Sequence, residues 1–146
     1  MIRFVVYEDI DRWRELAKEV EGLFGEMVGL PEFEEAINGC IASSSALCVT
    51  ADSGDVAGIV AINKDRNEIE WLAVKNQYRG KGHGFQLVEA ALNHLDTTKP
   101  IFVQTFAPNV EAGKPARQLY MRFGFRDYQD GGNNPAGVST VIMKLG

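Results

Sequence analysis

The chain has 146 residues, of which 45% are hydrophobic and 24% charged, and its formal net charge is −5 at pH 7. This balance is typical of one globular domain and excludes disordered, collagen-like and low-complexity chains. Domains that bind nucleic acid usually carry a basic surplus, so the acidic balance predicts no nucleic-acid partner.

The cysteines and the chain start indicate the cellular setting. Cys40 and Cys48 are too few for a disulfide framework, and their spacing matches no zinc motif, so we expect buried free thiols and no metal. The N-terminus turns acidic at Glu8, too early for a signal peptide, and the longest apolar stretch, residues 56–62, is far too short to span a membrane. These features predict a cytoplasmic protein without a membrane partner.

The first half of the chain predicts strands and helices in alternation. Residues 3–7 are rich in β-forming side chains and indicate a strand. Apolar residues between positions 13 and 24 recur at helical spacing, and Pro31 can begin a second helix that reaches Ile41. Three strands are predicted at residues 46–51, 56–62 and 68–74. The turns between them are short and polar, which suggests an antiparallel meander.

The second half begins with a glycine-rich segment, residues 77–84, that leads into a helical stripe at residues 87–95. A strand at residues 101–106 follows. The order of strand 68–74, glycine loop, helix and strand 101–106 implies a crossover that makes the two strands parallel. Pro115 fits the first turn of another helix, which Gly124 ends. Two last strands are predicted at residues 125–128 and 139–145, with a loop at residues 130–137 between them.

The glycine segment predicts an anion site. N–H groups at a helix start lack intrahelical partners and carry positive partial charge, and glycines let a phosphate approach the backbone. Arg79 and Lys81 add positive charge in an otherwise acidic chain. The alternative is a glycine-rich turn without a ligand.

Two common phosphate motifs do not fit this loop. A dinucleotide-binding fingerprint that starts at Gly80 would need a glycine where the chain has Phe85. A Walker A loop needs Ser or Thr after Gly-Lys, and here Gly82 follows.

Three segments resemble the GNAT superfamily of N-acetyltransferases. Residues 79–84, Arg-Gly-Lys-Gly-His-Gly, resemble its acyl-coenzyme A pyrophosphate loop, Gln/Arg-x-x-Gly-x-Gly/Ala. Residues 77–82 satisfy the same pattern, but the flanking strand and helix favour the register at Arg79. Residues 68–74 resemble the fourth strand of that family, which ends in Leu-Ala-Val, and residues 116–125 resemble its Ala-x-x-Leu-Tyr-x-x-x-Gly-Phe segment.

This resemblance implies a fold and a co-substrate. The expected fold is α/β (α+β), a single GNAT-like domain over residues 1–146, with a mixed, mostly antiparallel sheet, helices on both faces and a splayed central strand pair. Acetyl-coenzyme A (acetyl-CoA) would lie between the splayed strands, its pantetheine arm along residues 72–74 and its pyrophosphate on amides of residues 80–85. The implied contacts are Leu72, Ala73, Val74, Arg79, Gly80, Lys81, Gly82, His83, Gly84 and Phe85.

The implied reaction is transfer of an acetyl group by direct attack of a primary amine on a small molecule or peptide. Tyr120 holds the position of the family's tyrosine general acid, although it also fits a core stripe. The base is open between Glu70 and Glu68, which alternate onto one strand face and could instead be solvated. Some members place a glutamate on the fifth strand, where this chain has Gln104. A backbone N–H near Val74 could stabilise the oxyanion.

The acceptor side carries no recognisable motif. Its walls should come from the first two helices and from residues 107–113 and 130–137, while Trp13, Phe24, Met27 and Phe33 could line a pocket or belong to the core. An asparagine that the family often carries before the tyrosine is here Gly113, in a connection that looks longer than usual. The alternative function is a non-catalytic acyl-CoA-binding sensor or interaction module. The resemblance allows a homodimer, although no residue demands one.

Overall fold

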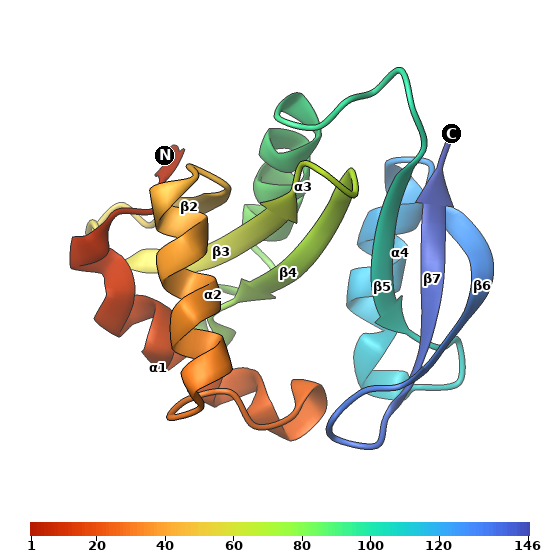
Figure 1. The fold of residues 1–146 in the computed structure, drawn as a ribbon, viewed down its shortest axis with the longest axis horizontal. Helices are drawn as coiled ribbons and strands as arrows, with labels where there is room; N and C mark the ends of the chain where they lie inside the picture. Colours follow the sequence, from red (N-terminus) through yellow and green to blue (C-terminus); the bar gives the residue numbers. More distant parts are fainter.

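Seven strands form one sheet in the order β1-β2-β3-β4-β5-β7-β6 in the computed structural model, which describes residues 1–146 (Figure 1). All neighbouring strands pair antiparallel except β4 and β5, which are parallel. The strands are β1 (Ile2–Phe4), β2 (Ala46–Thr50), β3 (Val56–Asn63), β4 (Glu68–Val74), β5 (Ile101–Phe106), β6 (Arg126–Asn133) and β7 (Ser139–Leu145).

Four helices cover the two faces of this sheet. Apolar side chains of α1 and α2, such as Leu16 and Ile37, pack on one face, and those of α3 and α4, such as Leu87 and Tyr120, pack on the other. The α/β fold with helices on both faces, expected from the sequence, is thereby confirmed. The helices are α1 (Ile10–Phe24), α2 (Pro31–Ala42), α3 (His83–Asn93) and α4 (Lys114–Arg122), with single 3-10 turns at η1 (Tyr7–Asp9), η2 (Asn76–Tyr78) and η3 (Glu111–Gly113).

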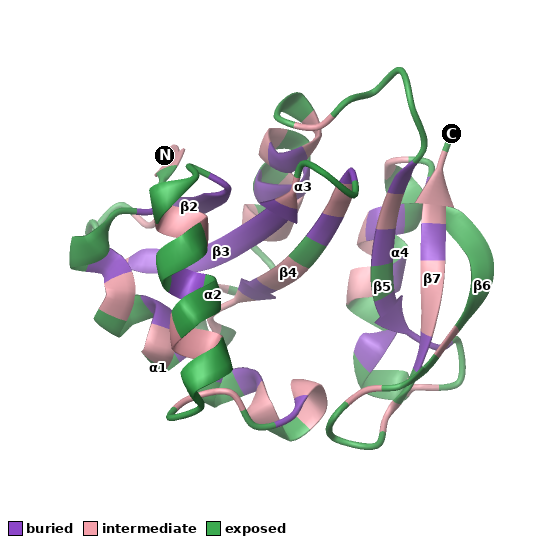
Figure 2. Ribbon diagram, in the orientation of Figure 1, coloured by how far each residue is buried: buried purple, intermediate pink, exposed green.

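Most of the core lies around the middle of the sheet. β3 is buried along almost its whole length, whereas the outer strand β6 is exposed (Figure 2). None of the helices has both the length and the apolar character that a membrane crossing needs.

Two strand boundaries differ from the sequence prediction by more than one residue. The first strand ends at Phe4 because the Asp9 carboxylate draws the next residues into a turn: it accepts a hydrogen bond from the Val6 N–H (2.9 Å) and pairs with Arg3 (2.7 Å). β6 continues to Asn133 because β7 offers it a hairpin partner, and two register shifts accommodate its polar and glycine residues.

The parallel pair at the centre of the sheet separates almost at once. β4 and β5 pair only at Glu68 with Phe102 and at Ile69 with Val103, and beyond that point the strands diverge (Figure 1). A bulge contributes to this divergence, because β3 pairs with Trp71 and then with Ile69, which leaves Glu70 as an extra residue. A bulge bends its strand, so the splayed pair expected from the sequence is present.

The turn between β6 and β7 closes the wide end of this opening. Asn134 Nδ2 donates a hydrogen bond of 2.7 Å to the carbonyl of Leu23, near the end of α1. The Asn134 Oδ1 accepts bonds from the N–H groups of Ala136 and Val138, which hold the turn in shape. The N-terminal and C-terminal parts of the sheet are thus joined at both ends of the opening.

Candidate active site

The opening frees one edge of β4. Beyond Ile69 this strand has no partner on the side of β5, so alternate N–H and C=O groups face the gap. Leu72, Ala73 and Val74, the residues that the resemblance implies for the pantetheine arm, lie on this stretch. A free strand edge can pair with an extended ligand that carries amide groups.

A cavity of about 330 Å³ fills the gap, and we call it the inter-strand cavity. Residues of β4, β5, α4 and the β6–β7 turn line it together with Phe24 of α1. The members that bear on chemistry are Glu70, Leu72, Gln104, Thr105, Tyr120 and Asn134.

The glycine loop lies just beyond the end of β4 and has the conformation that only glycine adopts easily. Gly80 has φ +76° and Gly82 has φ +84°. Gly82 caps α3 without a side-chain hydrogen bond, and the first intrahelical bond runs from the Gln86 N–H to the Gly82 carbonyl (3.1 Å). The N–H groups of residues 83–85 are therefore free to meet an anion.

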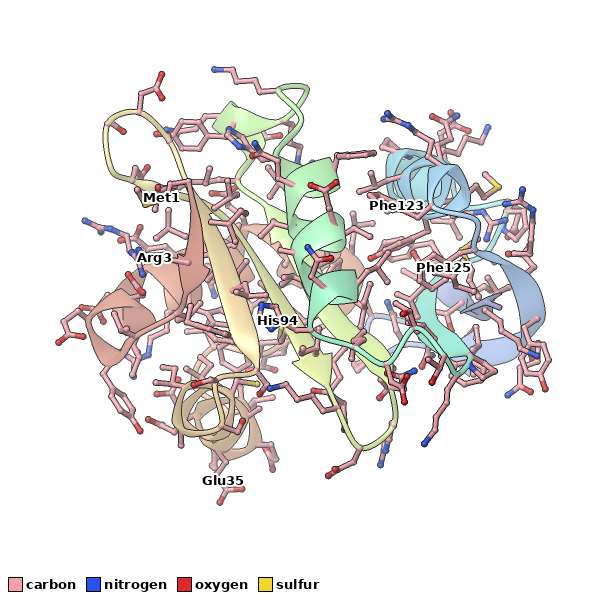
Figure 3. All side chains as sticks on the ribbon, turned by 90° about the horizontal axis from the view of Figure 1, so that it is seen from above. Met1, Arg3, Glu35, His94, Phe123 and Phe125 are labelled. Atoms are coloured by element: carbon pink, nitrogen blue, oxygen red, sulfur yellow. The ribbon has the colours of Figure 1, made fainter.

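Close packing also explains the third glycine. A Cβ on Gly84 would lie 3.0 Å from Leu119 Cδ2, a tight contact that the Leu119 side chain would have to shift to relieve. The ring of Phe85 packs on that of Phe123, the residue that follows α4, with 4.6 Å between the ring centres. Figure 3 places Phe123 with Phe125 in the half of the molecule that holds α4, away from Met1 and Arg3.

The cations of the loop differ in position. Arg79 Nε donates to the Val74 carbonyl (3.1 Å), which ties the loop to the end of β4. Lys81 Nζ lies 5.8 Å from the ring centre of Tyr78, and His83 meets the same ring edge-on at 6.1 Å. His83 Nδ1 is buried without a hydrogen-bond partner.

Tyr78 and Asp55 are loop-supporting residues that the sequence reasoning missed. The Tyr78 hydroxyl donates to Asp55 Oδ2 (3.1 Å), and Lys75 Nζ lies 3.5 Å from the same oxygen. The turn between β2 and β3 thereby fixes the start of the loop. No pattern in the sequence connects residue 55 with residue 78, because the contact depends on how β3 and β4 pair.

Tyr120 combines both roles that its sequence position left open. It is 4% exposed and packs on Phe125, with 5.7 Å between ring centres, and it also lines the inter-strand cavity. Burial raises the pKa of the Tyr120 hydroxyl well above its ordinary value. A tyrosine is protonated at neutral pH even at its ordinary pKa of about 10, and burial disfavours the phenolate further, so Tyr120 can act as a proton donor at the cavity.

A second cavity, of about 320 Å³, lies on the face of the sheet that α1 and α2 cover, and we call it the aromatic cavity. Trp13, Met27 and Phe33, which the sequence left between pocket and core, line it. So does Trp71, whose ring lies 5.9 Å from that of Trp13. The sequence reasoning missed Trp71 because strict alternation assigns it to the other face, and the bulge at Glu70 reverses that assignment.

The two strand glutamates have different surroundings. Both line the aromatic cavity, but Glu70 and Gln104 also line the inter-strand cavity and so lie where the two adjoin. Burial and then the nearby Glu70 raise the pKa of Glu68, while Arg66, 3.7 Å away, opposes this shift. Glu70 accepts a hydrogen bond from Asn63 Nδ2 (3.2 Å). The structure thus brings together the two carboxylates that the sequence could not rank.

The connection after β5 has no room for the asparagine that the resemblance implies. A Cβ on Gly113 would overlap the side chain of Phe106, so only glycine fits there. Lys114 Nζ pairs with Glu111 at 2.7 Å, which directs its charge to the connection itself.

Comparison with known proteins gives one family and one fold. A family model described as an acetyltransferase (GNAT) domain matches residues 15–146. A ribosomal-protein-alanine N-acetyltransferase from Brucella melitensis superposes with a TM-score of 0.77 at 16% identity, over 99% of this chain and 98% of that chain. No curated protein sequence matches the chain.

Two further solved structures share the fold. A phosphinothricin acetyltransferase from Sinorhizobium meliloti in complex with acetyl-CoA has a TM-score of 0.73 at 18% identity, over 99% of this chain and 86% of that chain. A chimeric spermidine N-acetyltransferase from Vibrio cholerae and hSSAT has a TM-score of 0.70 at 19% identity, over 99% and 95% of the two chains.

The raised pKa of Glu68 makes a prediction for stability. Because the folded-state pKa lies above the unfolded one, ionisation is less favourable in the folded protein, and stability falls as pH rises through the folded-state pKa. We expect Glu68→Gln to raise the melting temperature at pH 7, with the gain fading below the ordinary glutamate pKa of about 4.3. Thermal unfolding by circular dichroism from pH 4 to 8 measures this difference.

The exposed Glu89 on α3 supplies the matched control, since Glu89→Gln removes the same charge where no such burial exists. Equal pH profiles for the two variants, or a lower melting temperature for Glu68→Gln at pH 7, would contradict the prediction.

Proposed function

Because the chain belongs to the GNAT acetyltransferase family, we propose that it transfers an acetyl group from acetyl-CoA to a primary amine by direct attack. The observation that carries this proposal is the opening between β4 and β5, which joins a free strand edge to a buried tyrosine hydroxyl and a pair of carboxylates. The glycine loop at the end of β4 adds an anion site. All four features serve one reaction.

The residues present fit the co-substrate. Free N–H groups of residues 83–85 and the cations Arg79 and Lys81 suit a pyrophosphate. The unpaired edge of residues 70–74 suits the amide groups of a pantetheine arm, which would add to β4 as a further strand does. Acetyl-CoA, when bound, supplies an activated thioester.

Proton removal falls to the two glutamates. An alkyl amine with a pKa near that of lysine, about 10.4, is neutral in about one molecule per thousand at pH 7. Glu70, where the cavities adjoin, holds the ammonium group, and Glu68 accepts the proton directly or through one water. The raised pKa of Glu68 makes it a stronger base than an ordinary carboxylate, and the charge of Glu70 helps to maintain that shift.

Tyr120 donates a proton to the departing thiolate. Its side chain lines the inter-strand cavity, and its hydroxyl is protonated at neutral pH, as in an ordinary tyrosine. Burial raises the pKa of this hydroxyl and so disfavours the phenolate further. The oxyanion of the reaction is stabilised by a backbone N–H at the free edge of β4, on the part of the strand close to Glu70, which needs no side chain.

The first prediction of this proposal concerns binding. We expect Gly82→Glu to abolish acetyl-CoA binding measured by isothermal titration calorimetry, because it strains a φ of +84° and places a negative charge at the anion site. Gly22→Glu adds the same charge on an exposed turn of α1, where nothing lies within 4 Å of an added Cβ. The control should bind as the parent protein does; unaltered binding by Gly82→Glu would place the pyrophosphate elsewhere.

A second prediction concerns turnover. Tyr120→Phe should lower kcat by about a hundredfold or more, since positioned acids contribute about 10² to 10⁴, and should leave the Kd for acetyl-CoA nearly unchanged. Tyr128→Phe, at an exposed position on β6, controls for loss of a tyrosine hydroxyl. Release of free thiol with an amine panel gives the rate. An unchanged rate for Tyr120→Phe would remove Tyr120 from the mechanism. If the parent protein binds acetyl-CoA tightly but acetylates no amine, the alternative of a non-catalytic sensor is favoured.

A further inference from the structure

We propose that the acceptor is a primary monoamine with a compact apolar body, which occupies the aromatic cavity with its ammonium group at Glu68 and Glu70. This inference rests on the proposed function for the reaction and adds the class of substrate. Charge, wall chemistry and size of the aromatic cavity each support it.

The charge of the cavity selects a cation. Glu68 and Glu70 are its only charged lining residues, and both belong to the strand that separates it from the inter-strand cavity. Arg66, near Glu68, has a side chain that is 74% exposed and lies outside the lining. An ammonium group is therefore drawn to the junction where acyl transfer would occur, whereas an acceptor with its own carboxylate meets two like charges and no cation.

The remaining walls select an apolar body. Trp13, Trp71, Phe33, Met27 and Ile37 surround the space, and apolar surface that leaves water there contributes about 25 cal/mol per Å². An amine with an aromatic ring or a short alkyl chain thus gains contacts along its whole length.

The same walls disfavour a second cation. The unpaired polar groups buried here are the Nε1–H groups of Trp13 and Trp71, and both are donors. A second ammonium group would find no negative charge beyond the two glutamates, because the other polar side chain in the lining, Gln104, is neutral and lies with Glu70 where the two cavities adjoin. A buried charge without a charged partner is strongly unfavourable. Polyamines should therefore be poorer acceptors than monoamines of the same length.

The volume sets the size of the acceptor. About 320 Å³ lies at the lower end of the range for small-molecule pockets. One ring with a short side chain, or an alkyl chain of about six carbons, fits this space.

Two matched pairs of amines test the inference, with acetyl-CoA saturating and free thiol as the readout. Phenylalanine differs from phenethylamine by a carboxylate, and 1,6-diaminohexane differs from hexylamine by a second amine. We expect kcat/KM to be at least about tenfold higher for phenethylamine and for hexylamine than for their partners, the lower end of the discrimination that a pocket achieves. Equal kcat/KM values within each pair, or higher values for phenylalanine and 1,6-diaminohexane, would overturn the inference while leaving the acetyltransferase proposal intact.

A binding measurement without acetyl-CoA separates the two proposals. Cys40 lines the aromatic cavity, whereas Cys48 is 0% exposed, so a maleimide should label Cys40 selectively. Phenethylamine should slow this labelling, read by mass spectrometry, and phenylalanine should not. If phenethylamine protects Cys40 but no amine is acetylated, the acetyltransferase proposal is wrong and the amine-binding site stands. If phenethylamine at millimolar concentration gives no protection, the proposed binding site is wrong.

A variant at the rim of the cavity gives an independent check. Ala36 lines the cavity from an exposed position of α2, so Ala36→Phe should fill the cavity without disturbing the core. We expect the KM for phenethylamine to rise at least about tenfold, with the Kd for acetyl-CoA unchanged. Asn38→Phe, exposed on the same helix but outside the lining, should leave both constants unchanged; equal effects of the two variants would overturn the placement of the acceptor.

Discussion

Two residue pairs, Glu68 with Phe102 and Ile69 with Val103, are all that joins β4 to β5, and the whole candidate site depends on the separation of the two strands beyond these pairs. Parallel strands that stayed paired would use every backbone group of β4 and leave no space between the two halves of the sheet. Because the bulge at Glu70 bends β4, its edge stays free, a cavity opens between the strands, and Glu70 lies where the two cavities adjoin.

An open sheet needs connections that replace the missing ladder. On one face α3 and α4 provide them, with Phe85 stacked on Phe123 and Gly84 in close approach to Leu119. At the wide end the Asn134 side chain bonds to the carbonyl of Leu23. Contacts on both sides thus hold the two strands apart. The elements that make these contacts, α3, α4 and the β6–β7 turn, also carry the glycine loop, Tyr120 and part of the wall of the inter-strand cavity.

Sequence patterns predicted those parts of the site that depend on local physics. The bounds of β4 and β5 were correct because turn-forming residues flank short β-forming runs, and the glycine loop was recognisable because left-handed backbone requires glycine. Trp71 and Asn134 were missed because their places depend on strand register and on contact between distant segments. Glu68 and Glu70 looked equivalent by alternation, but the bulge at Glu70 and the different surroundings of the two carboxylates separate them. The roles of these residues in catalysis stay predictions.

Hydrogen exchange with and without acetyl-CoA tests the central claim most directly, because it reports on the free edge of β4 itself. Saturating acetyl-CoA should slow exchange at those amides of residues 70–74 that face β5 and at residues 83–85, while the amides of β2, already paired on both sides, keep their rates. Bound acetyl-CoA that leaves the exchange of residues 70–74 unchanged would contradict the account.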